Sequence, residues 1–423
     1  MLGLTLKWTI RAILVGFLCL GLANCTMLGL NYSSLETDNK PLLSPELTSQ
    51  FNPAETRATL EQELYGPWPE GLPVSAGEPR MIDDNYLEGR GTLQEVMVTI
   101  GAPSSARTFP VVIALPNKAD DTPVPLIISQ TFVGNCAVFP DQPIIGGDGQ
   151  VCEGPEVSGM LGFVATQIFG TYIAYAPIDR YFDAGIAYAS MDGSGFVPDK
   201  DGVAQDVMSQ LAPGTKPTGT LMSWAYAFSA VADVLGADPR VDDDSIAAMG
   251  HSRYGKSALI AAAWSDSIAA AIAHQSGFAG GSSSRSTTGE TLLRMVNGYP
   301  HWLRPGLGED LESGTELTLD QHYLLALAAP KPIFLGNGRR DVWSDPNSSF
   351  RIAQAADTIY KANGAKGLTA ENMRDFRADA DIAYWLRIGG HSVVSEDIDA
   401  FIAFTSAHFN TASPRENTLQ SAQ

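Results

Sequence analysis

From residue 92 to residue 409, short apolar runs typical of buried strands alternate with segments whose apolar residues recur at helical spacing. The strand-type runs are LQEVMVTIG (93–101), FPVVIALPN (109–117), VPLIISQTF (124–132), AGIAYASMD (184–192), DSIAAMG (244–250), IAAAIAHQS (268–276), KPIFLGN (331–337) and IAYWLRIGG (382–390). The helix-type segments are GTLMSWAYAFSAVADVLG (219–236), GKSALIAAAWS (255–265), DQHYLLALAA (320–329), FRIAQAADTIYKANG (350–364) and DIDAFIAFTSAHF (397–409). Because parallel strands need helical crossovers, this alternation predicts one α/β domain with a mostly parallel sheet covered by helices on both faces.

The rest of the chain lacks this periodicity. Residues 26–90 are rich in Pro, Asn, Ser, Glu and Gly, and we interpret them as a tether followed by an N-terminal arm that packs on the main domain. The α/β domain is then expected to cover residues 91–411, and residues 412–423 a flexible tail. With 423 residues, of which 44% are hydrophobic, the chain is long enough for one large core.

The net charge is −20, which argues against nucleic acid and against an anionic membrane surface as partners, because repulsion would oppose the encounter. We expect a monomer that needs no cofactor. There is no HExxH or CxxC motif, and PDKDG (198–202) lacks the later ligands of a calcium loop. We therefore expect no metal site and interpret PDKDG as a polar loop.

The N-terminus has the features of an export signal. Lys7 and Arg11 precede the uncharged run AILVGFLCLGLA (12–23), which is followed by Asn24 and Cys25. Residues 1–25 are interpreted as a signal peptide of the lipoprotein type with lipidation at Cys25. Plain secretion and a retained anchor are the alternatives, and in each case the mature protein lies outside the cytoplasm, in the periplasm, on the outer membrane or secreted. The only membrane contact expected is this anchor.

Two cysteines remain in the body of the chain, Cys136 and Cys152. In an oxidising compartment they are expected to form a disulfide, and two buried thiols are the alternative.

The chemistry centres on Ser252, in the stretch AAMGHSRYGKSAL (247–259). A strand runs into this serine and a helix begins directly after it, as in the nucleophile turn of α/β-hydrolases, although here the second glycine is Gly255 rather than residue 254. A serine that only caps a helix is the alternative.

A serine nucleophile needs a base and an acid, which follow it in chain order in this fold. His391 comes after a strand that ends in two glycines, whereas His408 lies near the end of the last helix and is expected to face solvent. Asp341 follows a late strand, with Asp345 as its rival. The expected triad is Ser252, Asp341 and His391.

Several motifs are spaced along the chain: TFVGN (131–135), DAGIAYASMDGSGFVPD (183–199), GHSRYGK (250–256), HQSGFAGG (274–281), SRSTTGET (284–291), GYPHWL (298–303), DQHYLLALAAPKP (320–332), DVWSDP (341–346) and GGHSV (389–393). In these motifs the chain resembles a known family, the glucuronoyl esterases of carbohydrate esterase family 15. The motifs occur in the family's order, which makes the resemblance far more specific than a lone serine turn.

The resemblance implies roles for further residues. Arg253 would stabilise the oxyanion, with backbone N–H groups near Gly134 and at Arg253 itself. Lys256 and Glu290 would bind hydroxyls of a uronic acid, and Trp343 would border the sugar.

The sequence also departs from the fungal members of this family. Gln275 stands where they carry an acidic Glu, and it cannot ionise. The positions of the fungal disulfide beside the triad read His251 and Ser392, and we interpret His251 as a packing residue. Bacterial relatives place an Asp after a later strand, which is where Asp341 stands.

The function expected from the resemblance is that of a serine esterase on an α/β-hydrolase fold. It would hydrolyse esters of (4-O-methyl-)glucuronic acid in a polysaccharide or oligosaccharide, as in lignin–xylan cross-links of lignocellulose, through a uronoyl-enzyme intermediate. A carbohydrate acetyl esterase and an inactive carbohydrate-binding lipoprotein are the alternatives.

Overall fold

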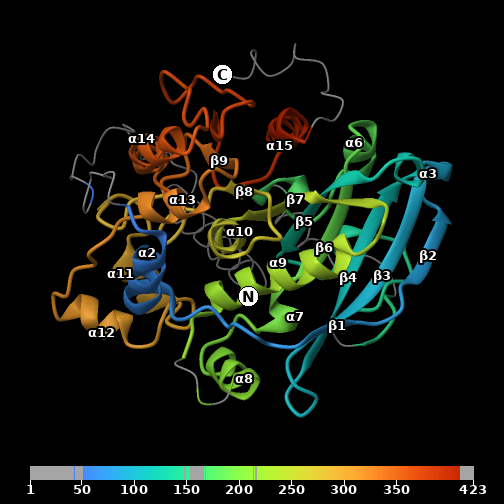
Figure 1. The fold of residues 1–423 in the computed structure, drawn as a ribbon, viewed down its shortest axis with the longest axis horizontal. Coiled ribbons are helices and arrows are strands. Elements are labelled where there is room, and N and C mark those ends of the chain that lie inside the picture. Colours follow the sequence, from blue (N-terminus) through green and yellow to red (C-terminus); the bar gives the residue numbers. More distant parts are fainter. Residues whose placement is uncertain are drawn as a thin grey trace, which may run out of the picture.

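The computed structural model describes residue 42 and residues 51–146, 149–152, 166, 168–212, 214 and 217–409. Ten strands form one sheet (Figure 1). They are β1 (Val74–Ala76), β2 (Arg80–Asn85), β3 (Gly91–Ile100), β4 (Arg107–Pro116), β5 (Val124–Thr131), β6 (Ala187–Asp192), β7 (Val241–His251), β8 (Ala270–His274), β9 (Ile333–Gly338) and β10 (Ile382–Arg387).

The strand order is β1-β3-β4-β6-β5-β7-β8-β9-β10, and β2 pairs with β3 as well. The strands from β6 to β10 in this order are parallel, whereas β1 to β4 pair antiparallel and β4 joins β6 antiparallel. The predicted α/β architecture with a mostly parallel sheet is therefore confirmed, with an antiparallel extension at one edge.

Helices lie between the parallel strands, before β1, between β2 and β3, and after β10. Those of the described residues are α2 (Pro53–Leu60), α3 (Tyr86–Gly89), α4 (Asn135–Val138), α6 (Ile178–Asp183), α7 (Gly193–Phe196), α8 (Val203–Leu211), α9 (Thr220–Gly236), α10 (Arg253–Trp264), α11 (Leu292–Gly298), α12 (Leu307–Glu312), α13 (His322–Ala328), α14 (Pro346–Ala362) and α15 (Ser395–His408). None of them combines the length and the apolar character needed to cross a bilayer.

The sheet separates two apolar cores. Leu126 and Ile128 of β5 pack into the larger one with α9, α10, α13 and α14, whereas Ile127 between them packs into the second one with α6 and α15. All eight residues of β5 are buried. A strand covered on both faces has no polar side to present, which explains the continuous apolar run in its sequence.

The N-terminal arm contributes more to the fold than its sequence indicates. After α2 it supplies β1 and β2, which both pair with β3. These strands were not predicted, because β1 has only three residues and β2 is mostly exposed, so neither shows an apolar alternation.

The parallel strands bring the candidate site residues together. Ser252 follows β7, Gln275 follows β8, Asp341 follows β9 and His391 follows β10. Because these four strands are parallel neighbours, the residues that follow them meet at one edge of the sheet.

Candidate active site

Ser252 lies at a strained turn between β7 and α10. Its backbone has φ 56° and ψ −123°, a conformation that non-glycine residues rarely adopt, and its N–H donates to the carbonyl of His274 at 2.8 Å. A Cβ at Gly250 would lie 2.2 Å from the carbonyl oxygen of Tyr254, and a Cβ at Gly255 would lie 2.9 Å from the carbonyl oxygen of Gly250. Close backbone contact across the turn therefore requires glycine at both positions and explains the unusual spacing.

His391 and Asp341 are in direct contact. Nδ1 of His391 lies 2.8 Å from Oδ2 of Asp341, whose side chain is completely buried. Burial alone would raise the pKa of Asp341, but the contact with His391 and hydrogen bonding from Ser344 hold this pKa below its ordinary value. The carboxylate is thus ionised beside the imidazole, as an acid that orients a catalytic base must be.

The rival acid has another task. Asp345 caps the N-terminus of α14, where its Oδ1 accepts from the N–H of Ser348 at 3.2 Å, and its Oδ2 accepts from the hydroxyl of Ser286. An N-cap satisfies backbone N–H groups that the helix itself cannot pair. Of the two candidate acids, Asp341 is the one that contacts His391.

The prediction that His408 faces solvent is wrong. Its side chain is only 12% exposed, its Nε2 lies 3.1 Å from the carbonyl oxygen of Ala380, and its ring contacts Phe404. The last turn of α15 packs over the segment that precedes β10, which covers this histidine. Its burial lowers the pKa of His408.

A cavity of about 390 Å³ opens at this edge of the sheet. Ser252, Arg253 and His391 line it together with residues that are mostly apolar: Phe132, Val133, Thr166, Phe169, Ile173, Ala174, His251 and Tyr299. Phe132 and Val133 line the cavity and directly precede Gly134 in the chain. The segment predicted to help stabilise the oxyanion therefore follows two residues that line the cavity. This volume is in the range of small-molecule sites.

Arg253 is held in place by a partly buried polar network. Its Nη1 lies 2.7 Å from Oδ2 of Asp199, and its guanidinium lies 4.7 Å from the ring centre of Phe132. Asp199 also accepts from Nε1 of Trp302 at 2.7 Å and contacts Nε2 of His301 at 2.8 Å. Burial raises the pKa of Asp199, but these three partners together lower it below its ordinary value.

Lys256, Glu290 and Trp343 form a group next to Asp341 and are not among the described residues that line the cavity. Lys256 is buried, and its Nζ donates to the carbonyls of Ser276 at 2.5 Å and Phe278 at 2.7 Å. Burial lowers the pKa of Lys256 to about 8, although the charges of Glu290 and Asp341 oppose this shift. Glu290 is joined to Trp343 through a backbone hydrogen bond of 3.4 Å, and burial raises the pKa of Glu290.

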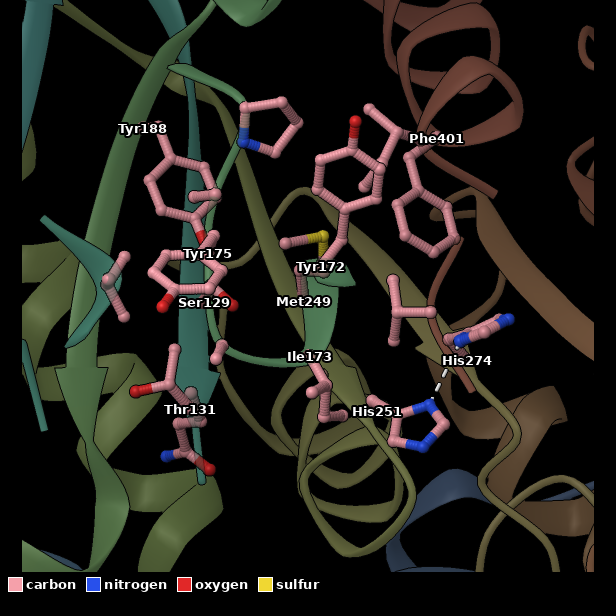
Figure 2. A pocket seen from close by; sticks show the side chains of 18 of the residues that line it. Ser129, Thr131, Tyr172, Ile173, Tyr175, Tyr188, Met249, His251, His274 and Phe401 are labelled. Carbon is pink, nitrogen blue, oxygen red and sulfur yellow. Dashed lines mark hydrogen bonds between the residues drawn. The ribbon is translucent and has the colours of Figure 1, made fainter. Parts of the chain in front are cut away.

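His251 packs between two other histidines. Its ring centre lies 4.5 Å from that of His391, and its Nδ1 lies 3.0 Å from Nδ1 of His274. Figure 2 shows this pair at the edge of a small cavity of about 50 Å³, lined by Tyr172, Tyr188 and Met249 among others. Burial, assisted by the positive charges nearby, holds the pKa of His251 well below its ordinary value, so the ring is neutral beside His391.

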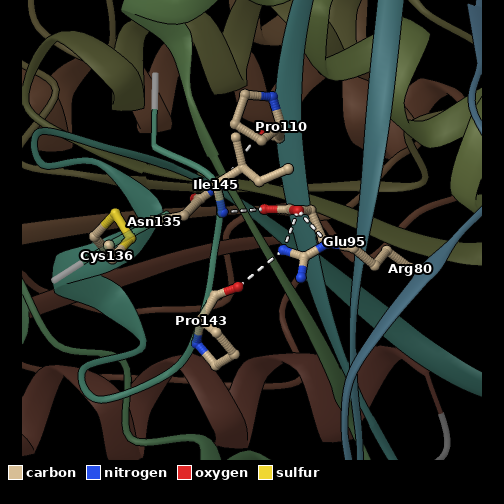
Figure 3. Close-up of a disulfide and its surroundings, with 8 residues drawn as sticks. Arg80, Glu95, Pro110, Asn135, Cys136, Pro143 and Ile145 are labelled. Carbon is tan, nitrogen blue, oxygen red and sulfur yellow. Dashed lines mark hydrogen bonds and ion pairs between the residues drawn. A yellow bond between two sulfur atoms is a disulfide. The ribbon is translucent and has the colours of Figure 1, made fainter. Parts of the chain in front are cut away.

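A disulfide joins Cys136 to Cys152, 16 residues apart (Figure 3). The loop between them is tied to the antiparallel part of the sheet. Glu95 of β3 accepts from the N–H of Ile145 at 2.8 Å and from Arg80 at 2.6 Å, and Arg80 also donates to the carbonyl of Pro143 at 2.9 Å. Cys136 lies in α4, which begins directly after Gly134. Cys25, the predicted lipidation site, lies outside the described residues.

The sequence alone did not reveal two features of this site: the contact of Asp199 with Arg253, and the hydrogen bonds of the Gln275 side chain. Asp199 ends the motif DAGIAYASMDGSGFVPD, but without the fold nothing connects it to Arg253, which is 54 positions later. From the sequence, Gln275 is only the position at which the fungal relatives carry an acidic Glu.

Comparisons with known proteins agree with this geometry. A family model described as "Glucuronyl esterase, fungi" matches residues 160–364, which contain Ser252 and Asp341 but not His391. A carbohydrate esterase from an unknown prokaryotic organism is 28% identical over 368 residues, covering 84% of this chain and 83% of that protein. A 4-O-methyl-glucuronoyl methylesterase of Phanerochaete carnosa is 28% identical over 258 residues, covering 57% of this chain and 63% of that protein.

Solved structures share the fold. A promiscuous esterase of carbohydrate esterase family 15 from a marine bacterial metagenome superposes with a TM-score of 0.75 at 25% identity, covering 89% of this chain and 99% of that one. A glucuronoyl esterase from Solibacter usitatus gives a TM-score of 0.72 at 24% identity, covering 88% of this chain and 98% of that one. With its α/β-hydrolase fold and its serine turn, the chain is similar in sequence and in fold to the glucuronoyl esterases of carbohydrate esterase family 15.

Proposed function

We propose that this protein is a serine esterase that hydrolyses esters of (4-O-methyl-)glucuronic acid, with Ser252 as nucleophile, His391 as base and Asp341 as the acid that orients the base. The observation that carries the proposal is the contact of 2.8 Å between Nδ1 of His391 and Oδ2 of Asp341, at a cavity that His391 lines together with Ser252. The match to the glucuronoyl esterase family model and the similarity to relatives named 4-O-methyl-glucuronoyl methylesterase support the choice of substrate.

In this reaction the Nδ1–H of His391 donates to Asp341, which leaves Nε2 as the basic nitrogen. Nε2 takes the proton of Ser252 while Oγ attacks the carbonyl carbon of the uronoyl ester. The tetrahedral intermediate then collapses, the ester C–O bond breaks, and the alcohol leaves with the proton from Nε2. Water, activated by the same nitrogen, hydrolyses the uronoyl-enzyme and releases the uronic acid.

The charge that develops on the carbonyl oxygen needs fixed donors. Arg253 is the proposed donor, assisted by backbone N–H groups at Arg253 and near Gly134. The positive charge of Arg253 is also useful because the product is a carboxylate, which the protein's net charge of −20 would otherwise repel. The ion pair with Asp199 fixes the guanidinium before substrate arrives, so that little reorganisation is required during the reaction.

The group of Lys256, Glu290 and Trp343 is proposed to bind the sugar, and the apolar wall of the cavity, with Phe132, Phe169 and Tyr299, is proposed to receive the alcohol. One observation favours a less selective ester hydrolase, such as a carbohydrate acetyl esterase: Nζ of Lys256 already donates to two carbonyls.

The test is a parallel assay of benzyl glucuronate and acetylated xylan, together with labelling of Ser252 by a fluorophosphonate. Preferential hydrolysis of benzyl glucuronate supports the uronoyl ester. Preferential deacetylation favours the acetyl esterase, and a protein that neither turns over nor takes the label is the inactive binding protein.

We further propose that the protein is exported and that Cys25 carries a lipid anchor. The export signal at residues 1–25 and the disulfide of the described domain support this, because disulfides persist in oxidising compartments. Metabolic labelling with an alkyne fatty acid, compared between the wild type and Cys25→Ala, tests the anchor.

A further inference from the structure

The side chain of Gln275 connects β8 to the loop that carries His391. Its Nε2 donates to the carbonyl of Gly390 at 2.9 Å, and its Oε1 accepts from the N–H of Ser392 at 2.9 Å. These two backbone groups belong to the residues directly before and after His391. One buried amide therefore pairs with both sides of the histidine, much as a peptide group pairs in a β-ladder.

The amide is itself firmly placed. The backbone N–H of Gln275 donates to the carbonyl of Gly336 at 2.7 Å, and its carbonyl accepts from the hydroxyl of Ser344 at 3.0 Å. Its φ of 49° lies in the left-handed region, which costs energy for a residue with a side chain. Such a backbone conformation persists only where the surrounding contacts compensate for it.

The space around the amide is also fully used. A Cβ at Gly338 would lie 2.5 Å from Nε2 of Gln275, 2.7 Å from the carbonyl oxygen of Gly390 and 2.8 Å from that of Gly389. A glycine at position 338 thus lets the end of β9, the amide and the loop approach one another. The amide sits where these three segments meet.

The loop depends on such contacts because its own sequence does not fix it. Gly389 and Gly390 precede His391, and glycine has the largest backbone freedom of all residues. On its other side the loop is tied by Arg387, whose Nη2 donates to the carbonyl of Ser392 at 2.5 Å and to its hydroxyl at 2.8 Å. Gln275 and Arg387 therefore bind opposite ends of the same residue, Ser392.

We infer that Gln275 is a positioning residue of the reaction. Its amide holds Gly390 and Ser392, so that Nδ1 of His391 stays in contact with Asp341 and Nε2 remains available as the base for Ser252. This inference rests on the proposed function, since it takes His391 as the base. It gives a role to a position where the fungal members of the family carry an acid. The contact needs one donor and one acceptor, which an amide has and an ionised carboxylate lacks.

The test compares Gln275→Met, which keeps the length but removes both hydrogen bonds, with Gln275→Asn, which keeps the polarity but is one methylene shorter. In both variants kcat on benzyl glucuronate is expected to fall roughly 10- to 100-fold, while KM changes by less than about threefold, because the base is displaced and substrate contacts are not. Hydrogen exchange of the peptide containing residues 388–394 is expected to accelerate in both, because the N–H of Ser392 loses its acceptor.

The matched control is Gln321→Met. Gln321 is equally buried, and its amide accepts from the hydroxyl of Tyr65 at 2.8 Å and donates to Ser284 at 3.2 Å. This variant is expected to lose stability but to keep kcat, and to leave exchange in residues 388–394 unchanged.

A kcat within twofold of wild type in either folded Gln275 variant would overturn the inference. If Gln275→Met does not fold, Gln275→Asn decides alone, and if neither folds, exchange in the wild type decides: an unprotected Ser392 amide would overturn the positioning role and a strongly protected one would support it. Ser252→Ala, assayed in parallel, distinguishes a failure of the proposed function from a failure of the positioning role. If it stays active, the proposed function is wrong. If it is inactive while the Gln275 variants match wild type, only the positioning role is wrong.

Discussion

The carboxylate of Asp341 lies 2.8 Å from Nδ1 of His391, although 50 positions separate the two residues along the chain. Asp341 follows β9 and His391 follows β10, and these two strands are parallel neighbours. The pairing of these two strands therefore brings Asp341 and His391 together, and it does so in the interior, where the carboxylate has no exposed surface. In such surroundings a charge acts strongly on its partner.

Neutralising the acid tests this relationship. Asp341→Asn is expected to keep the fold and to lower kcat by about 10⁴-fold, because an amide favours the wrong tautomer of His391 and does not stabilise the imidazolium. Steady-state kinetics on one uronate ester measures the loss. Asp345→Asn is the control, since asparagine also caps helices and the side chain of Asp345 caps α14. A fall of less than tenfold for Asp341→Asn would assign the acid elsewhere.

Removing the nucleophile is the second test. Ser252→Ala is expected to lower the esterase rate by about 10⁴-fold or more and to abolish fluorophosphonate labelling, because triad members act as a unit. Since φ at this position is 56°, alanine is strained there, and Ser252→Gly should be equally inactive but more stable. Substantial turnover by either pure variant would show that another group is the nucleophile.

The third prediction concerns the ion pair that orients Arg253. Asp199→Ala is expected to lower kcat by roughly 10- to 100-fold, because the guanidinium loses the contact that fixes it near the developing oxyanion. Asp201→Ala is the matched control: it lies two positions later on the same loop and pairs only with Gln205 among the contacts described. Equal activities of the two variants would show that Arg253 needs no anchor.

The buried charge of Lys256 predicts a pH dependence of stability. The folded state lowers the pKa of Lys256 from 10.5 to about 8, so between these values the unfolded chain binds a proton that the folded protein does not. Stability relative to Lys256→Met should therefore rise as the pH increases from about 8 toward 10.5, by about 3 kcal/mol in total. Urea unfolding at several pH values measures this difference. A difference that stays constant across this range would contradict the prediction.

The fifth prediction concerns the bridge between Cys136 and Cys152. The double substitution to alanine is expected to lower the free energy of unfolding by about 3 kcal/mol, because a closed loop of this length restricts the unfolded chain. Denaturant melts with and without a reducing agent measure it. Reduction should destabilise the wild type by a similar amount and leave the double variant unchanged. Insensitivity of the wild type to reduction would show that the bridge contributes nothing.

Much of the fold could be predicted from the sequence because its determinants are local. The strand and helix of the serine turn, the two glycines that it needs, and the glycines before His391 all lie within a few residues of the groups that they serve. Each predicted strand and helix between residues 93 and 409 has its counterpart in the structure. The strands β1 and β2 were not predicted, because their pairing with β3 depends on a partner strand and not on their own pattern.

The amino-acid sequence by itself determined the alternating α/β order, the turn at Ser252 and the short list of histidines and acids that could serve it. Only the tertiary structure brought Asp341 into contact with His391 and Arg253 into contact with Asp199. It also directed Lys256 to the carbonyls of Ser276 and Phe278, and it placed the amide of Gln275 between the carbonyl of Gly390 and the N–H of Ser392. The physical reason is that periodicity and turn chemistry act over a few residues, whereas hydrogen bonds at the edge of a parallel sheet join strand ends that the crossover helices keep far apart in the chain.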